Sequence, residues 1–146
     1  MTPGGRSAAA IEVLSEVFSG QSADRTLARW ARSNRYAGSK DRAAVRDIVF
    51  DVLWQRRSYA WAMGAPSDDS LSAEDPKELA RQLVIAQSAS TGQVLEVFTG
   101  EGHAPPKLSS RERAHLNTPQ APPPRAVAFD IPDFLDAPLT AALGAD

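Results

Sequence analysis

The chain has 146 residues, no cysteine and a net charge of −2, from 16 Lys and Arg against 18 Asp and Glu. This length suits one domain with a real hydrophobic core, and the lack of cysteine excludes disulfides, thiolate nucleophiles and Cys-ligated zinc. No apolar run approaches the roughly 20 residues of a membrane span, and the N-terminus does not read as a secretory signal, so we expect a cytoplasmic protein with no membrane partner.

The first predicted helix covers 7–18. Ile11, Leu14 and Phe18 occupy the i, i+3 and i+7 positions of one helix face. Ser7 is the expected N-cap of this helix, and Gly20 is its expected stop. The pattern predicts an amphipathic helix with one face in the core.

A second predicted helix, over about 23–34, has an apolar face and a basic face. Ser22 or Asp24 is its expected N-cap. Leu27 and Trp30 lie on the apolar face. The basic face carries residues at i, i+4 and i+7: Arg25, Arg29 and Arg32. A turn with Arg35 and Tyr36 follows.

The longest predicted helix covers 40–63, with Ser39 as its expected cap. It has the strongest apolar stripe in the chain. Arg42 and Arg46 are one turn apart, and Arg57 returns to nearly the same side about three turns later. We therefore expect these three arginines to share a face.

The second half of the chain predicts shorter helices. Ser72 and Asp75 resemble a capping box for a helix that starts near Pro76, and Ser109 and Glu112 resemble another. The predicted segments are a loop over 64–71, helices over 76–89, 94–98 and 109–116, a proline-rich linker over 117–125 and an amphipathic helix over 130–144. No segment alternates as a strand, so we expect an all-α fold.

Charge is unevenly distributed along the chain. Residues 25–57 carry nine Lys or Arg against three acids, a net charge of +6, whereas 58–146 carry six bases and twelve acids. A concentrated basic segment on helices attracts polyanions. The candidate RNA-binding residues are Arg25, Arg29, Arg32, Arg35, Tyr36, Lys40, Arg42, Arg46 and Arg57.

Two local hypotheses are more specific. A phosphate near Ser39, Lys40 and Arg42 would meet a helix N-terminus and two cations. Tyr36 could stack on a splayed base, although such a residue more often packs over its own loop. The basic rows could equally be ordinary solvated helix faces.

Histidine and tryptophan predict little chemistry. The two histidines, His103 and His115, offer too few ligands for a metal site, so none is expected. The tryptophans are expected in the core or at a domain interface, with Trp54 and Trp61 one heptad apart on a shared face.

The stretch SKDRAAVRDIVFDVLWQRRSYAW at 39–61 resembles the central helix of NusB-like RNA-binding domains. It is most similar to those at the N-terminus of the RsmB/NOP (Sun/Fmu-like) cytosine-5 ribosomal RNA methyltransferases. FTGEGHAPPKLSSRERA at 98–114 looks like the loop and helix of a shortened subgroup, and DIPDFLDAPLTAALG at 130–144 is similar to the helix that enters the methyltransferase domain. The resemblance covers most of the chain. It depends on the order of these segments along the chain and not on any single specific motif.

The resemblance implies a NusB-like helical bundle over 1–117 and a proline-rich linker and connecting helix over 118–146, leading towards an absent methyltransferase domain. In this family S-adenosylmethionine donates the methyl group, and a cysteine thiolate adds to the cytosine ring. The chain has no cysteine and no Gly-rich loop after a predicted strand, so we expect no catalysis and no cofactor in this chain alone.

Two functions remain open at this point. The first is an RNA-binding accessory domain whose partners are ribosomal RNA and its own catalytic methyltransferase domain. The second is a protein-docking module that packs on the catalytic domain or on another acidic protein.

Overall fold

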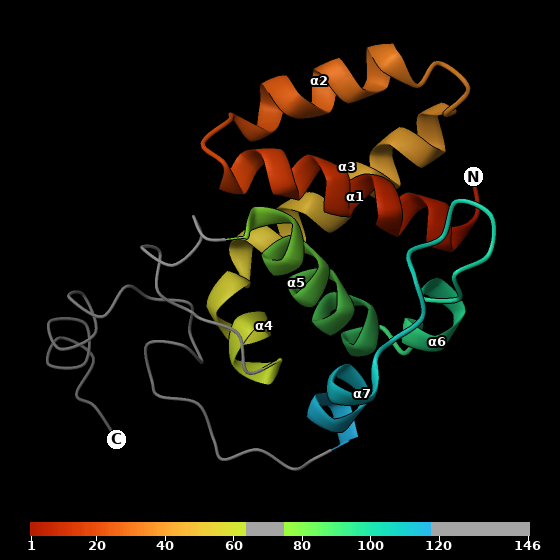
Figure 1. The fold of residues 1–146 in the computed structure, drawn as a ribbon. Coiled ribbons are helices and arrows are strands. Elements are labelled where there is room, and N and C mark those ends of the chain that lie inside the picture. The colour runs from red at the N-terminus through yellow and green to blue at the C-terminus, as the bar shows by residue number, and fades with distance from the viewer. Residues whose placement is uncertain (64–74, 118–146) are drawn as a thin grey trace, which may run out of the picture.

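The computed structural model describes residues 1–63 and 75–117, and within these ranges every regular element is a helix (Figure 1). The predicted all-α fold is confirmed for this part of the chain. The helices are α1 (Pro3–Phe18), α2 (Ala23–Ser33), α3 (Ser39–Trp54), α4 (Arg56–Ala62), α5 (Pro76–Ser90), α6 (Val94–Val97) and α7 (Ser110–Asn117). The expected loop over 64–71, the Ser72 cap, and the linker and helix within 118–146 lie outside the described residues.

Helices α1 and α5 form the centre of the bundle. Helix α1 packs against α2, α3, α5 and α6, while α5 packs against α1, α3, α4, α6 and α7. Figure 1 shows α2 above α1, on the side away from α5. No helix in the two described ranges has the length and apolar character needed to cross a lipid bilayer.

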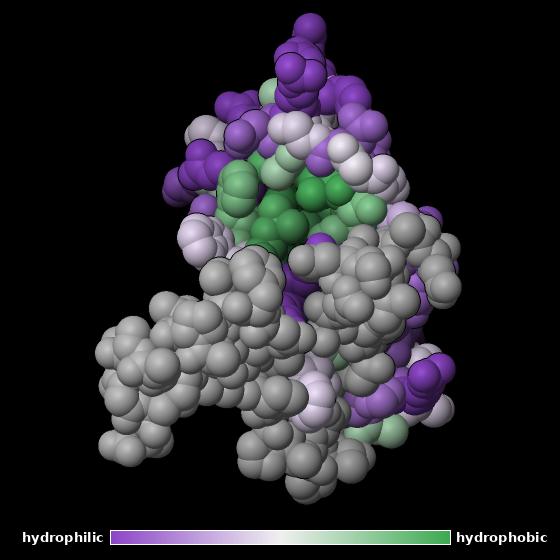
Figure 2. All heavy atoms as spheres, turned by 90° about the vertical axis from the view of Figure 1, so that its left-hand side faces the viewer, coloured by the Kyte–Doolittle hydropathy of each residue, from purple (hydrophilic) through white to green (hydrophobic). Residues whose placement is uncertain are grey.

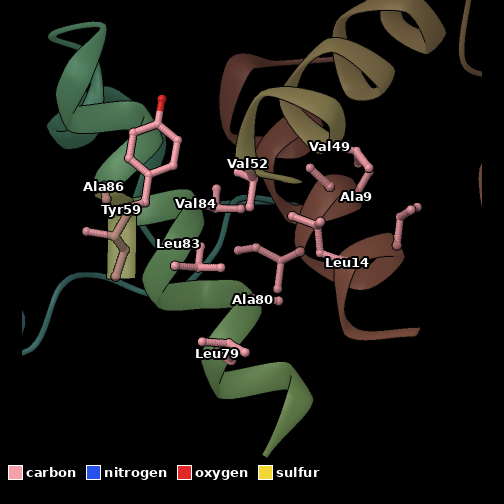
Figure 3. Close-up of a cluster of buried hydrophobic side chains, with 14 of the residues drawn as sticks. Ala9, Leu14, Val49, Val52, Tyr59, Leu79, Ala80, Leu83, Val84 and Ala86 are labelled. Atoms are coloured by element: carbon pink, nitrogen blue, oxygen red, sulfur yellow. The ribbon is translucent and has the colours of Figure 1, made fainter. Parts of the chain in front are cut away.

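The hydrophobic core lies between α1, α3, α4 and α5 (Figure 3). Leu14 of α1, Val49 of α3 and Leu83 of α5 are each completely buried. Burying a side chain of this size stabilises the fold by about 1.5–3 kcal/mol. These residues belong to the apolar stripes that the helical periodicity predicts.

The first helix starts earlier than predicted. Thr2, not Ser7, is the N-cap: its Oγ1 accepts the Gly5 N–H at 3.0 Å, and Pro3 occupies the first turn. Ser7 lies inside the helix and is buried. The glycine pair favours a loop by propensity, but tertiary packing against the Ala104 loop holds it as helix.

The predicted long helix over 40–63 is broken, and this correction affects the site. Helix α3 ends at Trp54, and α4 starts at Arg56 after Gln55, whose backbone angles are φ −111° and ψ 25°. The Tyr59 hydroxyl donates to Asp51 at 2.9 Å across this break. This hydrogen bond ties the two helices together at the break.

The second half is held together by the predicted capping box of α7. The Ser109 N–H donates to Glu112 at 2.8 Å, and the Glu112 N–H donates to Ser109 Oγ at 3.1 Å. Glu112 also receives two hydrogen bonds from Arg81 of α5, at 2.9 and 3.0 Å. The same carboxylate thus caps α7 and ties it to α5.

Candidate nucleic-acid interface

Helix α2 presents its arginines because its other face is anchored. Ser22 is the N-cap and its Oγ accepts the Arg25 N–H at 3.4 Å. Thr26 and Trp30 are buried at 1% and 7% exposure on the inner face. Helical spacing then directs Arg25, Arg29 and Arg32 away from the core, and all three are exposed.

The start of α3 already contains a carboxylate. Gly38, not the predicted Ser39, is the N-cap, and its N–H donates to Asp41 at 3.2 Å. Asp41 also pairs with Arg6 of α1 at 2.8 Å and with the N-terminal ammonium at 3.5 Å. The hydrogen bond from Arg6 is the largest cause that holds the pKa of Asp41 below its usual value; burial opposes it, and Gly38 and the two cations add to it. A phosphate near Ser39 and Lys40 would compete with this carboxylate.

Most of the candidate residues are at the surface. Tyr36 is 70% exposed in the turn between α2 and α3, and Arg57 is half-buried on α4. The exposed cations come from α2, the following turn and α3: Arg25, Arg29, Arg32, Arg35, Lys40, Arg42 and Arg46.

Two of these cations face carboxylates. Arg29 pairs with Glu16 of α1 at 2.9 Å, and Arg46 lies 3.9 Å from Asp47, a loose contact between exposed groups. Arg42 donates to the Ala37 carbonyl oxygen. Among the described residues, no ion pair involves Arg25, Arg32, Arg35 or Lys40, and these four define the unpaired basic row. Because exposed ion pairs contribute only about 0–1 kcal/mol, the pairing of Arg29 and Arg46 is weak and can be exchanged for phosphate.

The break at Gln55 contradicts the prediction that Arg57 shares a face with Arg42 and Arg46. Only one continuous helix over 40–63 would return Arg57 to their side, whereas Arg57 belongs to α4. Arg56 is half-buried, and its guanidinium lies over the Phe18 ring, 4.9 Å from the centroid.

A groove that the sequence analysis missed lies between α2 and α3. Its volume is about 290 Å³. Its walls come from both helices: Leu27, Ala28, Trp30, Ala31, Ser39, Arg42, Ala43 and Arg46. Small side chains at Ala28, Ala31 and Ala43 leave this space. Alanines on the facing sides of two adjacent basic helices are the sequence signal that could have indicated it.

The tryptophans behave differently from one another. Trp30 is buried as expected, Trp61 is half-buried, and Trp54 is 78% exposed at the end of α3. The helix break lies between Trp54 and Trp61, so a heptad spacing does not place them on one continuous face.

Figure 2 shows the side of the molecule where α1 ends and α2 begins, with a hollowed apolar area below hydrophilic side chains.

Residues 100–104 form a turn that packs against the start of α1. Its Gly100 N–H donates to the Pro105 carbonyl oxygen at 2.9 Å, and its Ala104 lies against Gly4. Across residues 1–63 and 75–117, no three His, Asp or Glu side chains come together in a way that could hold a metal ion.

No family model, curated protein or solved structure matches this chain.

Proposed function

We propose that this chain is an RNA-binding accessory domain of an S-adenosylmethionine-dependent ribosomal RNA (cytosine-5) methyltransferase. It grips ribosomal RNA through phosphates on the basic face of α2 and α3, and it presents the target to a catalytic domain. The chain itself supplies no nucleophile and no methyl donor. The catalytic chemistry belongs to the other domain.

The unpaired basic row supports this proposal most strongly. Arg25 and Arg32 lie on α2, Arg35 lies in the turn and Lys40 lies on α3, and all four are exposed. Arginine suits this role because its planar guanidinium binds phosphate bidentately and also stacks on exposed bases. The net charge of +6 over residues 25–57, in a chain of net charge −2, shows how strongly the cations are concentrated.

The experiment is a salt titration of RNA binding. Fluorescence anisotropy with ribosomal RNA fragments would compare the parent with the triple variant Arg25→Ala, Arg32→Ala, Lys40→Ala. Each lost phosphate contact flattens the slope of log affinity against log salt by about 0.7–0.9, so three lost contacts flatten it by roughly 2–3. The variant should bind more weakly to every fragment.

A matched control removes the same charge elsewhere. Lys77→Ala, Arg111→Ala, Arg113→Ala changes three exposed cations of α5 and α7. This control should keep nearly the affinity and slope of the parent. Equal losses in the two triple variants would show that RNA responds only to net charge and would refute the assignment of this face.

A second candidate function, a protein-docking module, is favoured by exposed apolar surface. Trp54 is 78% exposed although tryptophan is a frequent anchor of protein interfaces. The apolar hollow in Figure 2 offers further area for such a contact. In this alternative the basic row pairs with carboxylates of the catalytic domain or of another acidic protein.

Trp54→Ser separates the two candidates. If the domain binds RNA through the basic row, this change leaves the anisotropy titration unaltered. If the domain docks on protein, the change weakens association with the catalytic domain, and RNA binding stays at the level of any mildly cationic surface.

A further inference from the structure

We infer that the groove between α2 and α3 is a binding site for one unstacked nucleotide of single-stranded RNA. This inference rests on the proposed function and adds a site that distinguishes an unstacked base from a stacked one. The basic row holds phosphates of any RNA, whereas this groove accepts a base that has left its stack.

The groove has an apolar floor and a basic rim. Leu27, Ala31 and Ala43 supply aliphatic surface from both helices, and the floor rests on the buried Trp30. Arg42 and Arg46 stand on one wall of the groove, one helical turn apart on α3. An apolar slot edged by two guanidinium groups matches a nucleotide, which combines a flat base with an anionic phosphate.

The geometry of Arg42 favours a preformed site. Its Nη1 donates to the carbonyl oxygen of Ala37 at 3.2 Å, which orients the guanidinium at the groove. A guanidinium has five N–H donors, so four remain for a ligand. Arg46 has only the loose contact to Asp47 at 3.9 Å, and its side chain is 59% exposed. Its plane is therefore available to stack on a base.

The size of the groove limits what can occupy it. At about 290 Å³ the groove lies just below the usual range of ligand sites, roughly 300–1,000 Å³. It suits one nucleotide and is too small for a large cofactor. The bases of an RNA duplex are stacked inside the helix, so only an unpaired or extruded base can enter.

The test compares two RNA probes on the full chain. The probes are a short single-stranded uridine RNA and an RNA duplex of the same length, each measured by anisotropy at one fixed salt concentration. Ala43→Leu fills the groove without changing charge. We expect it to weaken single-strand binding about tenfold while duplex binding stays unchanged. Ala114→Leu, at an exposed alanine of α7, is the matched control and should change neither.

A second variant protects the test against misfolding. Arg46→Lys keeps the charge but removes the planar guanidinium, so it should weaken single-strand binding several-fold and weaken duplex binding, which depends mainly on the positive charge, much less. Arg111→Lys is its control. Circular dichroism melting of each variant establishes that the fold is intact.

The outcomes distinguish this inference from the function on which it rests. If the parent binds neither probe, the proposed RNA-binding function fails. If the parent binds both probes and the two groove variants bind single strands as the parent does, RNA binding stands and the groove site is refuted. Equal weakening of both probes by Arg46→Lys and by Ala43→Leu would also refute the groove site, because it shows no preference for unstacked bases.

Discussion

Arg29 of α2 lies with its Nη2 2.9 Å from Glu16 Oε2 of α1, and this ion pair joins the basic face to an acidic side chain thirteen positions earlier. Both side chains are about half exposed, at 52% and 45%. Glu16 would therefore compete with any phosphate that binds at Arg29, the middle arginine on the basic face of α2. The relationship makes α1 a modulator of any polyanion that binds to α2.

Removing this competitor should strengthen RNA binding. Glu16→Gln frees Arg29 and deletes one negative charge beside the row, so we expect roughly two- to fivefold higher affinity for ribosomal RNA fragments at low salt. Anisotropy titration measures the change. Glu96→Gln, an exposed acid of α6, is the control and should have little effect. An unchanged affinity in Glu16→Gln would place the RNA elsewhere.

Gly4 is expected to be intolerant of a side chain. A Cβ at this position would lie 2.6 Å from Ala104 Cβ and 3.0 Å from the Val97 carbonyl oxygen, both held by neighbouring backbone. Gly4→Ala should lower the free energy of unfolding by about 1–3 kcal/mol, measured by urea denaturation.

The neighbouring glycine provides the control for this prediction. At Gly5 the nearest atoms to a new Cβ are Thr2 Oγ1 at 3.3 Å and His103 Cβ at 3.8 Å, both in side chains. Alanine favours a helix over glycine by about 1 kcal/mol, so Gly5→Ala should be neutral or stabilising. Equal destabilisation by the two changes would contradict the close approach at Gly4.

Among the described carboxylates, we expect substitution of Glu112 to lower the stability of the fold most. Its side chain is 8% exposed, and Arg81, Gln82 and the Ser109 N–H all donate to it. Glu112→Gln leaves the largely buried guanidinium of Arg81 without its counter-charge. We expect a loss of about 2–4 kcal/mol in the free energy of unfolding. Glu101→Gln, at an exposed site, should cost almost nothing.

The contribution of Glu112 should also depend on pH. Burial alone raises the pKa of Glu112, but the hydrogen bonds from Arg81, Ser109 and Gln82 and the charge of Arg81 outweigh it, so the pKa is lowered. A folded-state pKa below the unfolded one gives stability that is complete above the ordinary carboxyl range and is lost as the pH falls through the lowered value. Urea denaturation on acidification should therefore show the parent and Glu112→Gln converging. A constant difference down to acid pH would contradict this.

Trp54 and Trp30 lie at opposite extremes of burial, so replacing the first should change stability little and replacing the second should lower it strongly. Trp54 is 78% exposed, so Trp54→Ser should change the free energy of unfolding by less than about 0.5 kcal/mol. Trp30 is 7% exposed, so Trp30→Ala should cost about 3–5 kcal/mol. Thermal unfolding followed by circular dichroism measures both, and similar losses would mean that Trp54 is covered.

The fold class was readable from the sequence because helical periodicity and capping are local. The apolar stripe through Val45, Val49 and Val52 predicted the buried face of α3, and Ser109 with Glu112 predicted the cap of α7. The basic face of α2 followed in the same way from the spacing of its arginines. Each of these features depends on residues within a few turns of one another.

The tertiary structure decided what depends on distant residues. No local pattern in the sequence encodes the break at Gln55. The same holds for the ion pairs between helices, which join Arg29 to Glu16 and Asp41 to Arg6. The groove between α2 and α3 belongs to the same class, since a space between two helices exists only after they pack. The sequence by itself therefore determined which side chains are cationic and, through their spacing, which of them point outward. Packing determined which of them are already engaged and where the groove between α2 and α3 lies.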